Sequence, residues 1–300
     1  MRKTLLLLGV VASTLALSAC GTTTKATIDQ SVASLGAQSS VQIHLTATAT
    51  GTATTQAQAI LKLVSVDLNY VNPSGGALSQ ATSTLDQEIT INVGSKTLAD
   101  IRGIGGNDYL NIDLTSLSSL PGVNLPASEL AALQLIIGGR WFEIPKSLIA
   151  SVAQKDTTAT KAQVAAEVAI ERKIVDAIAK VIDDGHAKAL SGGGYSETGT
   201  LASIVKAVWP TVASLTKTTL PASAASVKGS YTLTLTTSGS TATGASITIT
   251  SPGGEPQITS VGLVATITHN AETIAVPSDA TVITPALLKQ LETSGTTGTL

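Results

Sequence analysis

Histidines and carboxylates are the first residues of this chain to test for metal binding or acid–base chemistry. His44, His186 and His269 lie far apart, and none has a second histidine or a cysteine at the spacing of a metal site. The segment Asp183–His186 is acidic, but it lies where a predicted helix ends at a glycine, which favours a solvated helix end. The sequence therefore predicts neither a metal site nor a cofactor.

Glycine- and serine-containing segments are the candidates for nucleotide binding and covalent catalysis. Gly103–Gly106 lacks the spacing of a dinucleotide loop, and Gly192–Gly194 is not followed by the Lys-Ser or Lys-Thr of a phosphate loop. No Gly-x-Ser-x-Gly nucleophile elbow is present. We interpret both glycine segments as turns and expect no enzymatic activity.

Aromatic residues are few, and one pair could contribute to a ligand site. Trp141 and Phe142 are the only adjacent pair among seven aromatic residues. They could line a binding site, although aromatic side chains more often fill a core. Trp209, just before Pro210, has the same two interpretations.

Cys20 is the only cysteine, and it closes an N-terminal segment of the secretory type. Arg2 and Lys3 precede an apolar run over residues 5–17, which ends in small residues before Cys20. This pattern is typical of a signal peptide, and the run is too short for a membrane-spanning helix. It resembles the lipobox of bacterial lipoproteins, whose cysteine receives a diacylglycerol on sulfur and becomes the first mature residue. The alternative is an ordinary secretory signal with an incidental cysteine.

We therefore assign residues 1–19 to a lipoprotein signal peptide, 20–26 to a lipidated tether and 27–300 to a single domain. The mature chain has 281 residues with 16 basic and 20 acidic side chains, a net charge of about −4. Because phosphate binding needs clustered Lys and Arg, we expect no nucleic-acid partner. Without a second cysteine, stability must come from burial of Leu, Ile and Val.

The N-terminal third predicts one helix and an antiparallel meander. The spacing of the apolar residues favours a helix over Thr27–Gln38. Val41, Ile43 and Leu45 then alternate with polar residues, which predicts a strand whose His44 side chain points away from the buried face. Near Leu63 the apolar residues move from odd to even positions, which predicts a bulge or a sharp bend. The remaining alternating segments predict about five strands in total and are 64–68, 89–93, 98–102 and 109–112.

The middle of the chain is predicted to be helical and the last third to return to strands. Expected helices cover 113–120, 127–137, 145–154, 160–183 and 201–215, where Pro210 should kink or end the last one, and a short strand covers 140–144. A second meander is expected over 231–235, 247–249 and 261–267. The simplest architecture is an α+β fold in which both strand blocks join into one strongly curved antiparallel sheet, a half-barrel with helices packed on its concave side.

Three segments resemble the actinobacterial LppX/LprAFG lipoproteins. They are Gly105–Leu114, Gly139–Pro145 and Ile274–Ala280. The resemblance implies a lipobox, a helix before a strongly curved antiparallel sheet, and helices around an apolar cavity. It also implies carriage of acylated lipids or lipoglycans across the cell envelope.

The expected function is that of a lipid-anchored extracytoplasmic carrier, held on the outer face of the cell membrane through Cys20. Its hydrophobic ligand, an acylated lipid or lipoglycan, would occupy a cavity between sheet and helices. The residues expected to line the cavity are Ile43, Leu63, Ile91, Trp141, Leu233 and Leu263. The alternative is a non-catalytic structural or partner-binding lipoprotein with a filled core. In both cases we expect a monomer.

Overall fold

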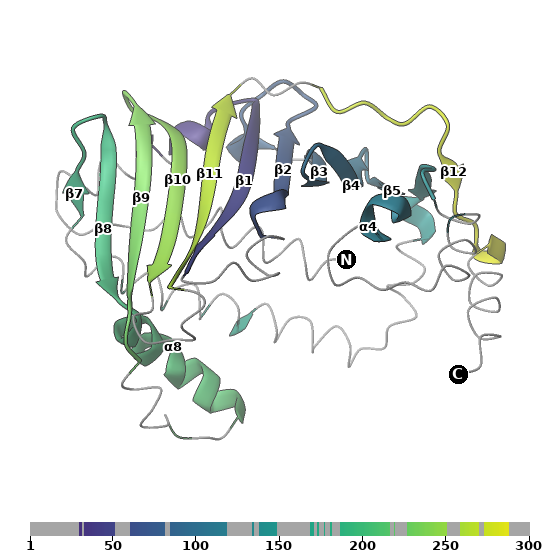
Figure 1. Cartoon of the computed structure of the whole chain (residues 1–300). Coiled ribbons are helices and arrows are strands. Elements are labelled where there is room, and N and C mark those ends of the chain that lie inside the picture. Colours follow the sequence, from purple (N-terminus) through teal and green to yellow (C-terminus); the bar gives the residue numbers. More distant parts are fainter. Residues whose placement is uncertain are drawn as a thin grey trace, which may run out of the picture.

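The computed structural model describes residues 30–31, 33–51, 61–81, 85–118, 134, 138–148, 169–170, 173, 177, 181, 187–216, 219, 227–250, 259–269 and 273–287. Within this part of the chain, twelve strands form one sheet in the order β12-β6-β5-β4-β3-β2-β1-β11-β10-β9-β8-β7 (Figure 1). All neighbouring strands are antiparallel except β12 and β6. The sheet is open, with the two-residue strands β12 and β7 at its edges.

The chain builds this sheet from two meanders that meet at its centre. The first comprises β1 (Ser40–Thr50), β2 (Val64–Val71), β3 (Asp86–Val93), β4 (Lys96–Ile104), β5 (Asn107–Ile112) and β6 (Phe142–Ile144). The second comprises β7 (Lys188–Ala189), β8 (Gly194–Thr200), β9 (Ser230–Ser238), β10 (Thr241–Thr250) and β11 (Ser260–His269), and β12 (Thr281–Val282) completes the far edge. The pairing of β1 with β11 confirms that the two strand blocks form one sheet.

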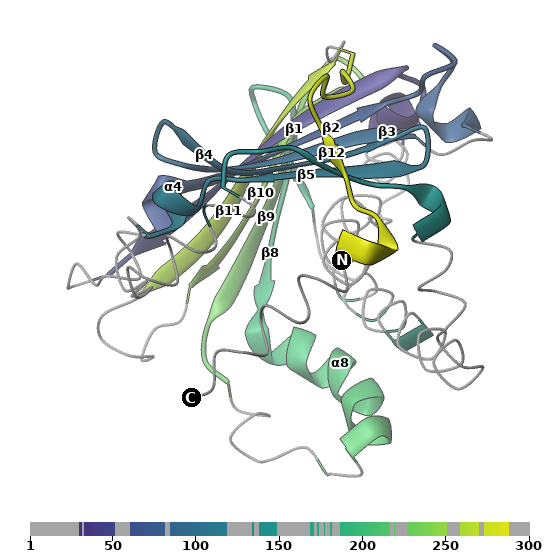
Figure 2. The same ribbon diagram turned by 90° about the vertical axis from the view of Figure 1, so that its right-hand side faces the viewer.

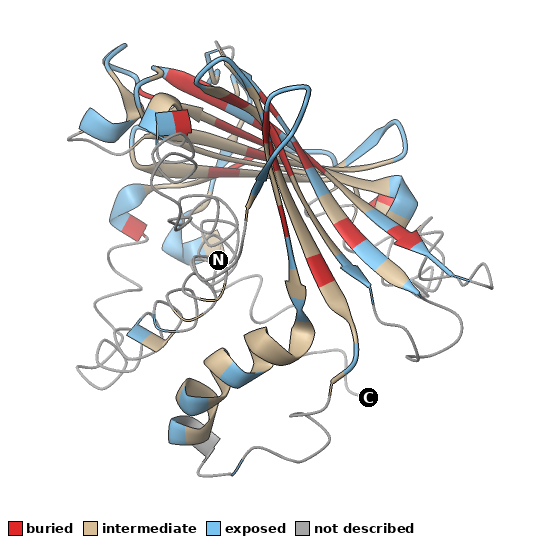
Figure 3. Ribbon diagram, turned by 90° about the vertical axis from the view of Figure 1, so that its left-hand side faces the viewer, coloured by how far each residue is buried: buried red, intermediate tan, exposed pale blue. Residues whose placement is uncertain are grey.

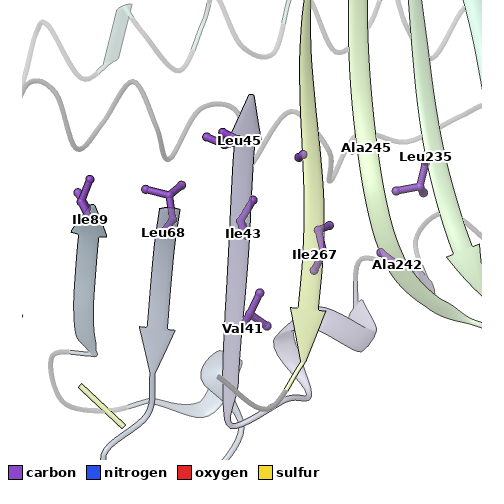
Figure 4. Packing of buried hydrophobic residues seen from close by; sticks show 10 residues of the cluster. Val41, Ile43, Leu45, Leu68, Ile89, Leu235, Ala242, Ala245 and Ile267 are labelled. Atoms are coloured by element: carbon purple, nitrogen blue, oxygen red, sulfur yellow. The ribbon is translucent and has the colours of Figure 1, made fainter. Parts of the chain in front are cut away.

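The two faces of the sheet differ in chemistry, as the alternation of the sequence requires. One row of directly opposed apolar residues crosses seven strands, from β11 to β6: Ile267, Ile43, Leu68, Ile89, Ile101, Leu110 and Phe142. The other face carries mainly threonine, serine and charged residues. We call these the apolar face and the polar face. Figure 4 shows the buried cluster of the apolar face, whose side chains come from adjacent strands.

The strands rotate progressively across the sheet. In Figure 2 the strands β8–β11 run steeply, whereas β3–β5 run nearly across the view. Two register shifts, at Ile91/Asn92 in β3 and at Ala242/Gly244 in β10, accompany this strong twist. The expectation of a large antiparallel, open sheet is thus confirmed.

Few helices belong to the described residues. Positions 30–31 and 33–36 are helical, a 3-10 turn η1 covers Leu78–Gln80, and α4 covers Leu114–Ser118. Asp113 caps α4, since its Oδ1 accepts hydrogen bonds from the Thr115 and Ser116 amides at 2.9 and 3.1 Å. The Ser116 hydroxyl also donates a hydrogen bond to Asp113 Oδ2. This bond makes the largest contribution to lowering the pKa of Asp113 below its usual value, and the two amide bonds add to it.

The longest described helix, α8 (Leu201–Thr216), confirms the helix predicted over 201–215. Of the two effects expected of Pro210, a kink or an end, the end is wrong, because the helix continues for six residues beyond it. Pro210 and Lys206 are both exposed, so water can solvate the Lys206 carbonyl that a proline at position 210 leaves without a helical partner. Figure 1 shows α8 below the ends of β8 and β9, and Figure 3 shows that it is mostly half-buried.

The change of period at Leu63 does not come from a bulge, because residues 61–63 are helical and β2 begins at Val64. The turn predicted before Tyr195 is confirmed over residues 191–193, and β8 begins directly after it at Gly194. The turn at Gly105 and Gly106 is confirmed, with φ values of 59° and 91°.

The helices predicted over 127–137 and 160–183 lie largely outside the described residues. The described positions within them are helical: 134, 169, 170, 173, 177 and 181. Their packing on a concave side of the sheet stays a prediction.

Candidate ligand-binding face

Four of the six residues expected to line a cavity lie on the apolar face. Ile43 is buried in the row that crosses β11 to β6. Ile91 and Leu263 are partly buried and pack against the buried cluster. Leu233 shares their face, because it and Leu263 both lie opposite Ile247 of β10.

These four side chains do not converge on a single point. Leu233 and Leu263 are two strands apart, about 10 Å at the usual strand spacing. Ile91 is on β3 and is separated from β9 by four intervening strands, so it lies about 24 Å from Leu233. The apolar face is therefore wide enough to hold an extended acyl chain, and the four residues mark different parts of it.

The other two predicted residues lie elsewhere. Leu63 is in the helical turn before β2, and 44% of it is exposed. The ring of Trp141 packs against the Arg102 guanidinium, with 4.6 Å between the Arg102 Cζ and the ring centroid. Arg102 lies opposite Glu88 and Tyr109, on the polar face. Contact of Leu63 or Trp141 with a ligand stays a prediction that this geometry does not favour.

Small side chains occupy the middle of the apolar face. Ala245 and Ala265 are directly opposed, and the row continues to Leu235 on one side and to Leu45 on the other. Both alanines are buried. Their side chains rise less far from the sheet than the leucines at either side.

The apolar face reaches solvent at one end. Ile249 of β10 and Val261 of β11 are directly opposed, and 39% and 41% of them are exposed. Ala49 of β1 continues this row and is buried. An apolar surface that begins in the core thus extends to the end of three strands.

One polar pair lies within the apolar face, and sequence reasoning missed it. Glu197 of β8 is opposite Leu233 and is 5% exposed, and its Oε1 accepts a hydrogen bond of 3.2 Å from the hydroxyl of Tyr231. Burial, the Glu197 charge and this bond raise the pKa of Tyr231 to about 12. The Tyr231 ring lies over Gly199, where a Cβ would overlap it.

A network around Arg102 organises the polar face near the β12 edge. Its Nε lies 2.8 Å from Glu88 Oε1, its Nη2 donates to Asp100 Oδ2 at 2.9 Å, and its Nη1 donates to the carbonyl of Ala275 at 2.8 Å. Together with the stacked Trp141, these contacts hold the segment around Ala275 against β4.

Asn107 extends this network to the β5–β6 connection. Its amide donates to Glu143 Oε1 at 2.9 Å, and its Oδ1 accepts from the Lys146 amide at 3.0 Å. The amide of Ile283 donates to the Glu143 carbonyl at 2.8 Å. Asn107 and Glu143 belong to two of the segments on which the family resemblance rests, and Arg102 connects the third segment, through the Ala275 carbonyl, to the same side of the sheet.

A second polar group lies at the centre of the polar face. His44 Nδ1 is 2.6 Å from Asp67 Oδ1, and Asn92 donates to Asp67 Oδ2 at 2.8 Å. The expected outward position of His44 is confirmed, since its side chain is 46% exposed. Within the described part of the chain, no three His, Cys, Asp or Glu residues are grouped so that they could hold a metal ion.

No protein-family model matches this chain, and no curated protein matches its sequence. Among solved structures, it is similar to the crystal structure of Mycobacterium tuberculosis lipoprotein LppX, with 14% sequence identity and a TM-score of 0.33. The match covers 83% of this chain and 97% of that chain. A TM-score of this size carries no weight for function, which must be inferred from the residues of this chain. Among the described residues, no helix is long and apolar enough to cross a membrane.

Proposed function

We propose that this protein is a lipid-anchored extracytoplasmic carrier that binds the acyl chains of a lipid or lipoglycan against the apolar face of its sheet. The observation that carries the proposal is the width of that face. Directly opposed apolar residues cross most of the sheet, and the centre of the face holds Ala245 and Ala265 in place of bulkier side chains. An acyl chain needs a long apolar surface with few polar groups, and this face supplies one.

The position of the polar groups supports the same proposal. The Arg102 and Asp67 networks are on the polar face, so their charges do not interrupt the surface offered to a hydrocarbon chain. On the apolar face, the Glu197–Tyr231 pair lies at the β8 side. It is the place where a lipid headgroup with hydroxyl groups would find hydrogen-bonding partners.

Anchoring through Cys20 completes the proposal. A diacylglycerol on Cys20 would keep the domain beside the membrane that supplies or receives its ligand. The tether over residues 20–26 would leave the domain free to turn, because it contains no apolar side chain larger than alanine.

A structural lipoprotein with a filled core is the second candidate, and one observation favours it. Val41, Ile43, Leu68 and Ala242 are all less than one-tenth exposed, and so are Ala245 and Ala265, so this part of the apolar face is already covered. If that cover packs against the two alanines without a void, there is no room for an acyl chain.

Two measurements separate the candidates. Native mass spectrometry of residues 20–300 carrying Cys20→Ser, purified from its own host, should detect a co-purified lipid. Ala265→Phe should then lose that lipid while keeping its melting temperature, because a wall residue beside a void accepts added volume. Thr266→Phe adds an aromatic ring on the polar face and is the matched control.

A carrier predicts lipid in the parent and in Thr266→Phe, with loss in Ala265→Phe. An empty parent together with an Ala265→Phe variant destabilised by about 1–3 kcal/mol would show a solid core and refute the proposal.

A further inference from the structure

One end of the sheet combines exposed apolar side chains with exposed lysines. We call it the Thr50 end: β1 and β10 finish there, and β2, β9 and β11 begin there. Its apolar residues are Ile249, Val261 and Leu63, which are 39%, 41% and 44% exposed. Leu63 is held at this end by its carbonyl, which accepts a hydrogen bond of 2.8 Å from Gly94 in the β3–β4 turn.

Three lysines flank these apolar residues, and all are exposed. Lys62 precedes Leu63, Lys96 follows the β3–β4 turn, and Lys228 lies two residues before β9. Two acidic residues are described near this end: Asp113, whose carboxylate caps α4 and is close enough to Lys96 for the lysine charge to help lower its pKa, and the buried Glu197. The connections over 52–60 and 251–258 contain one charged residue, Glu255.

This local charge is opposite to that of the chain, whose formal net charge is −2. Exposed aliphatic side chains beside lysines fit the interface of a bilayer with anionic lipids. The aliphatic groups enter the boundary of the acyl region, and each lysine near the surface contributes through its attraction to the headgroups. Lysine side chains also tolerate this position, since their stems lie along apolar surface while their charges remain in water.

We infer that the Thr50 end docks onto an anionic lipid bilayer. The inference rests on the proposed function, because the apolar face opens to solvent at this same end through Ile249 and Val261. A lipid leaving the bilayer there would pass from the membrane interior onto the apolar face without crossing water. Figure 1 shows this end as the lower ends of β1 and β9–β11, where α8 also lies.

The test is vesicle flotation of residues 20–300 with Cys20→Ser. All described elements lie within residues 30–287, so removal of the leader takes away no described part of the fold. Vesicles of equal parts phosphatidylglycerol and phosphatidylcholine are compared with phosphatidylcholine alone, at low and high salt. We expect binding to the anionic vesicles that weakens with salt.

Substitutions locate the binding surface. Lys62→Gln with Lys96→Gln should weaken partitioning by about 25-fold, at about fivefold for each lysine. The matched control is Lys146→Gln with Lys188→Gln, two exposed lysines away from this end. Val261→Ser should also weaken binding, whereas Val282→Ser, an exposed valine on the β12 edge, should not.

Absence of binding to anionic vesicles would overturn the inference, and so would equal losses in test and control variants. Co-purified lipid without vesicle binding would refute docking and leave the carrier proposal intact. Vesicle binding by a chain that holds no lipid would refute the carrier proposal alone.

Discussion

Lysine substitutions at two adjacent positions of β3 test the assignment of the two faces. Ile91 lies on the apolar face, directly opposite Val66 and Ala99, and packs against the buried cluster. Thr90 is its neighbour in sequence but lies on the polar face, directly opposite Asp67 and Asp100. The same new side chain therefore enters two opposite environments one residue apart.

The expected losses differ by several kcal/mol. Ile91→Lys forfeits about 2 kcal/mol of apolar transfer free energy and adds a desolvation cost for an ammonium group without a partner, so the free energy of unfolding should fall by about 3–5 kcal/mol. Thr90→Lys should stay within about 1 kcal/mol of the parent. An opposite-charge pair across neighbouring strands contributes about 0.2–1 kcal/mol, which offsets the lost threonine contacts.

Urea unfolding followed by circular dichroism measures both values. A loss of 3–5 kcal/mol is a large part of the stability of an ordinary domain, so Ile91→Lys should shift the midpoint strongly or unfold the protein. Equal midpoints for the two variants would refute the face assignment, and a greater loss in Thr90→Lys would reverse it.

Three further predictions concern other parts of the chain. Gly199→Ala should destabilise the domain, because its Cβ would overlap the Tyr231 ring and displace the hydroxyl from Glu197. Gly192→Ala adds a Cβ in open space at a glycine without a positive φ and is the control; similar losses in the two variants would contradict the packing argument. Tyr231 should contribute a loss of stability of about 1.4 kcal/mol per pH unit from pH 10 toward 12, since unfolded Tyr231 releases its proton near 10 whereas folded Tyr231 keeps it to about 12. Burial also raises the pKa of Tyr70, so Tyr231→Phe should reduce the decline without abolishing it, and an unchanged slope would contradict the raised pKa of Tyr231. Cys20→Ser should move the protein from the membrane to the soluble fraction at high salt without changing its melting temperature, and membrane retention under those conditions would refute lipid anchoring.

The strands were predictable where one face carries aliphatic side chains and the other does not. The alternation of Val41, Ile43 and Leu45 predicted β1 and its buried face, and the aliphatic residues at every second position of β9 and β11 did the same. The residues of β8 gave no such signal, because its sequence GYSETGT contains no aliphatic side chain. It is a strand because β9 supplies its hydrogen-bonding partner.

The candidate site was predictable in its chemistry and only partly in its location. Alternation alone placed Ile43, Ile91, Leu233 and Leu263 on one face, since side-chain direction follows from parity within a strand. It could not place Trp141, whose position depends on Arg102, and Arg102 in turn binds the carbonyl of a residue 173 positions away. Contacts between segments so far apart leave no periodic pattern in a single sequence.

The segments that carry the family resemblance therefore bear on the fold and not on the ligand. Asn107 and Glu143 join β5 to β6, and Arg102 joins β4 to the segment before β12, all at one edge or on the polar face. None of these contacts touches the apolar face. Because the edge of the sheet is held from the polar face, residues on the apolar face can vary in size without loosening that edge. Under the proposed function, ligand preference would then depend on side chains such as Ala245 and Ala265, which are outside the polar network.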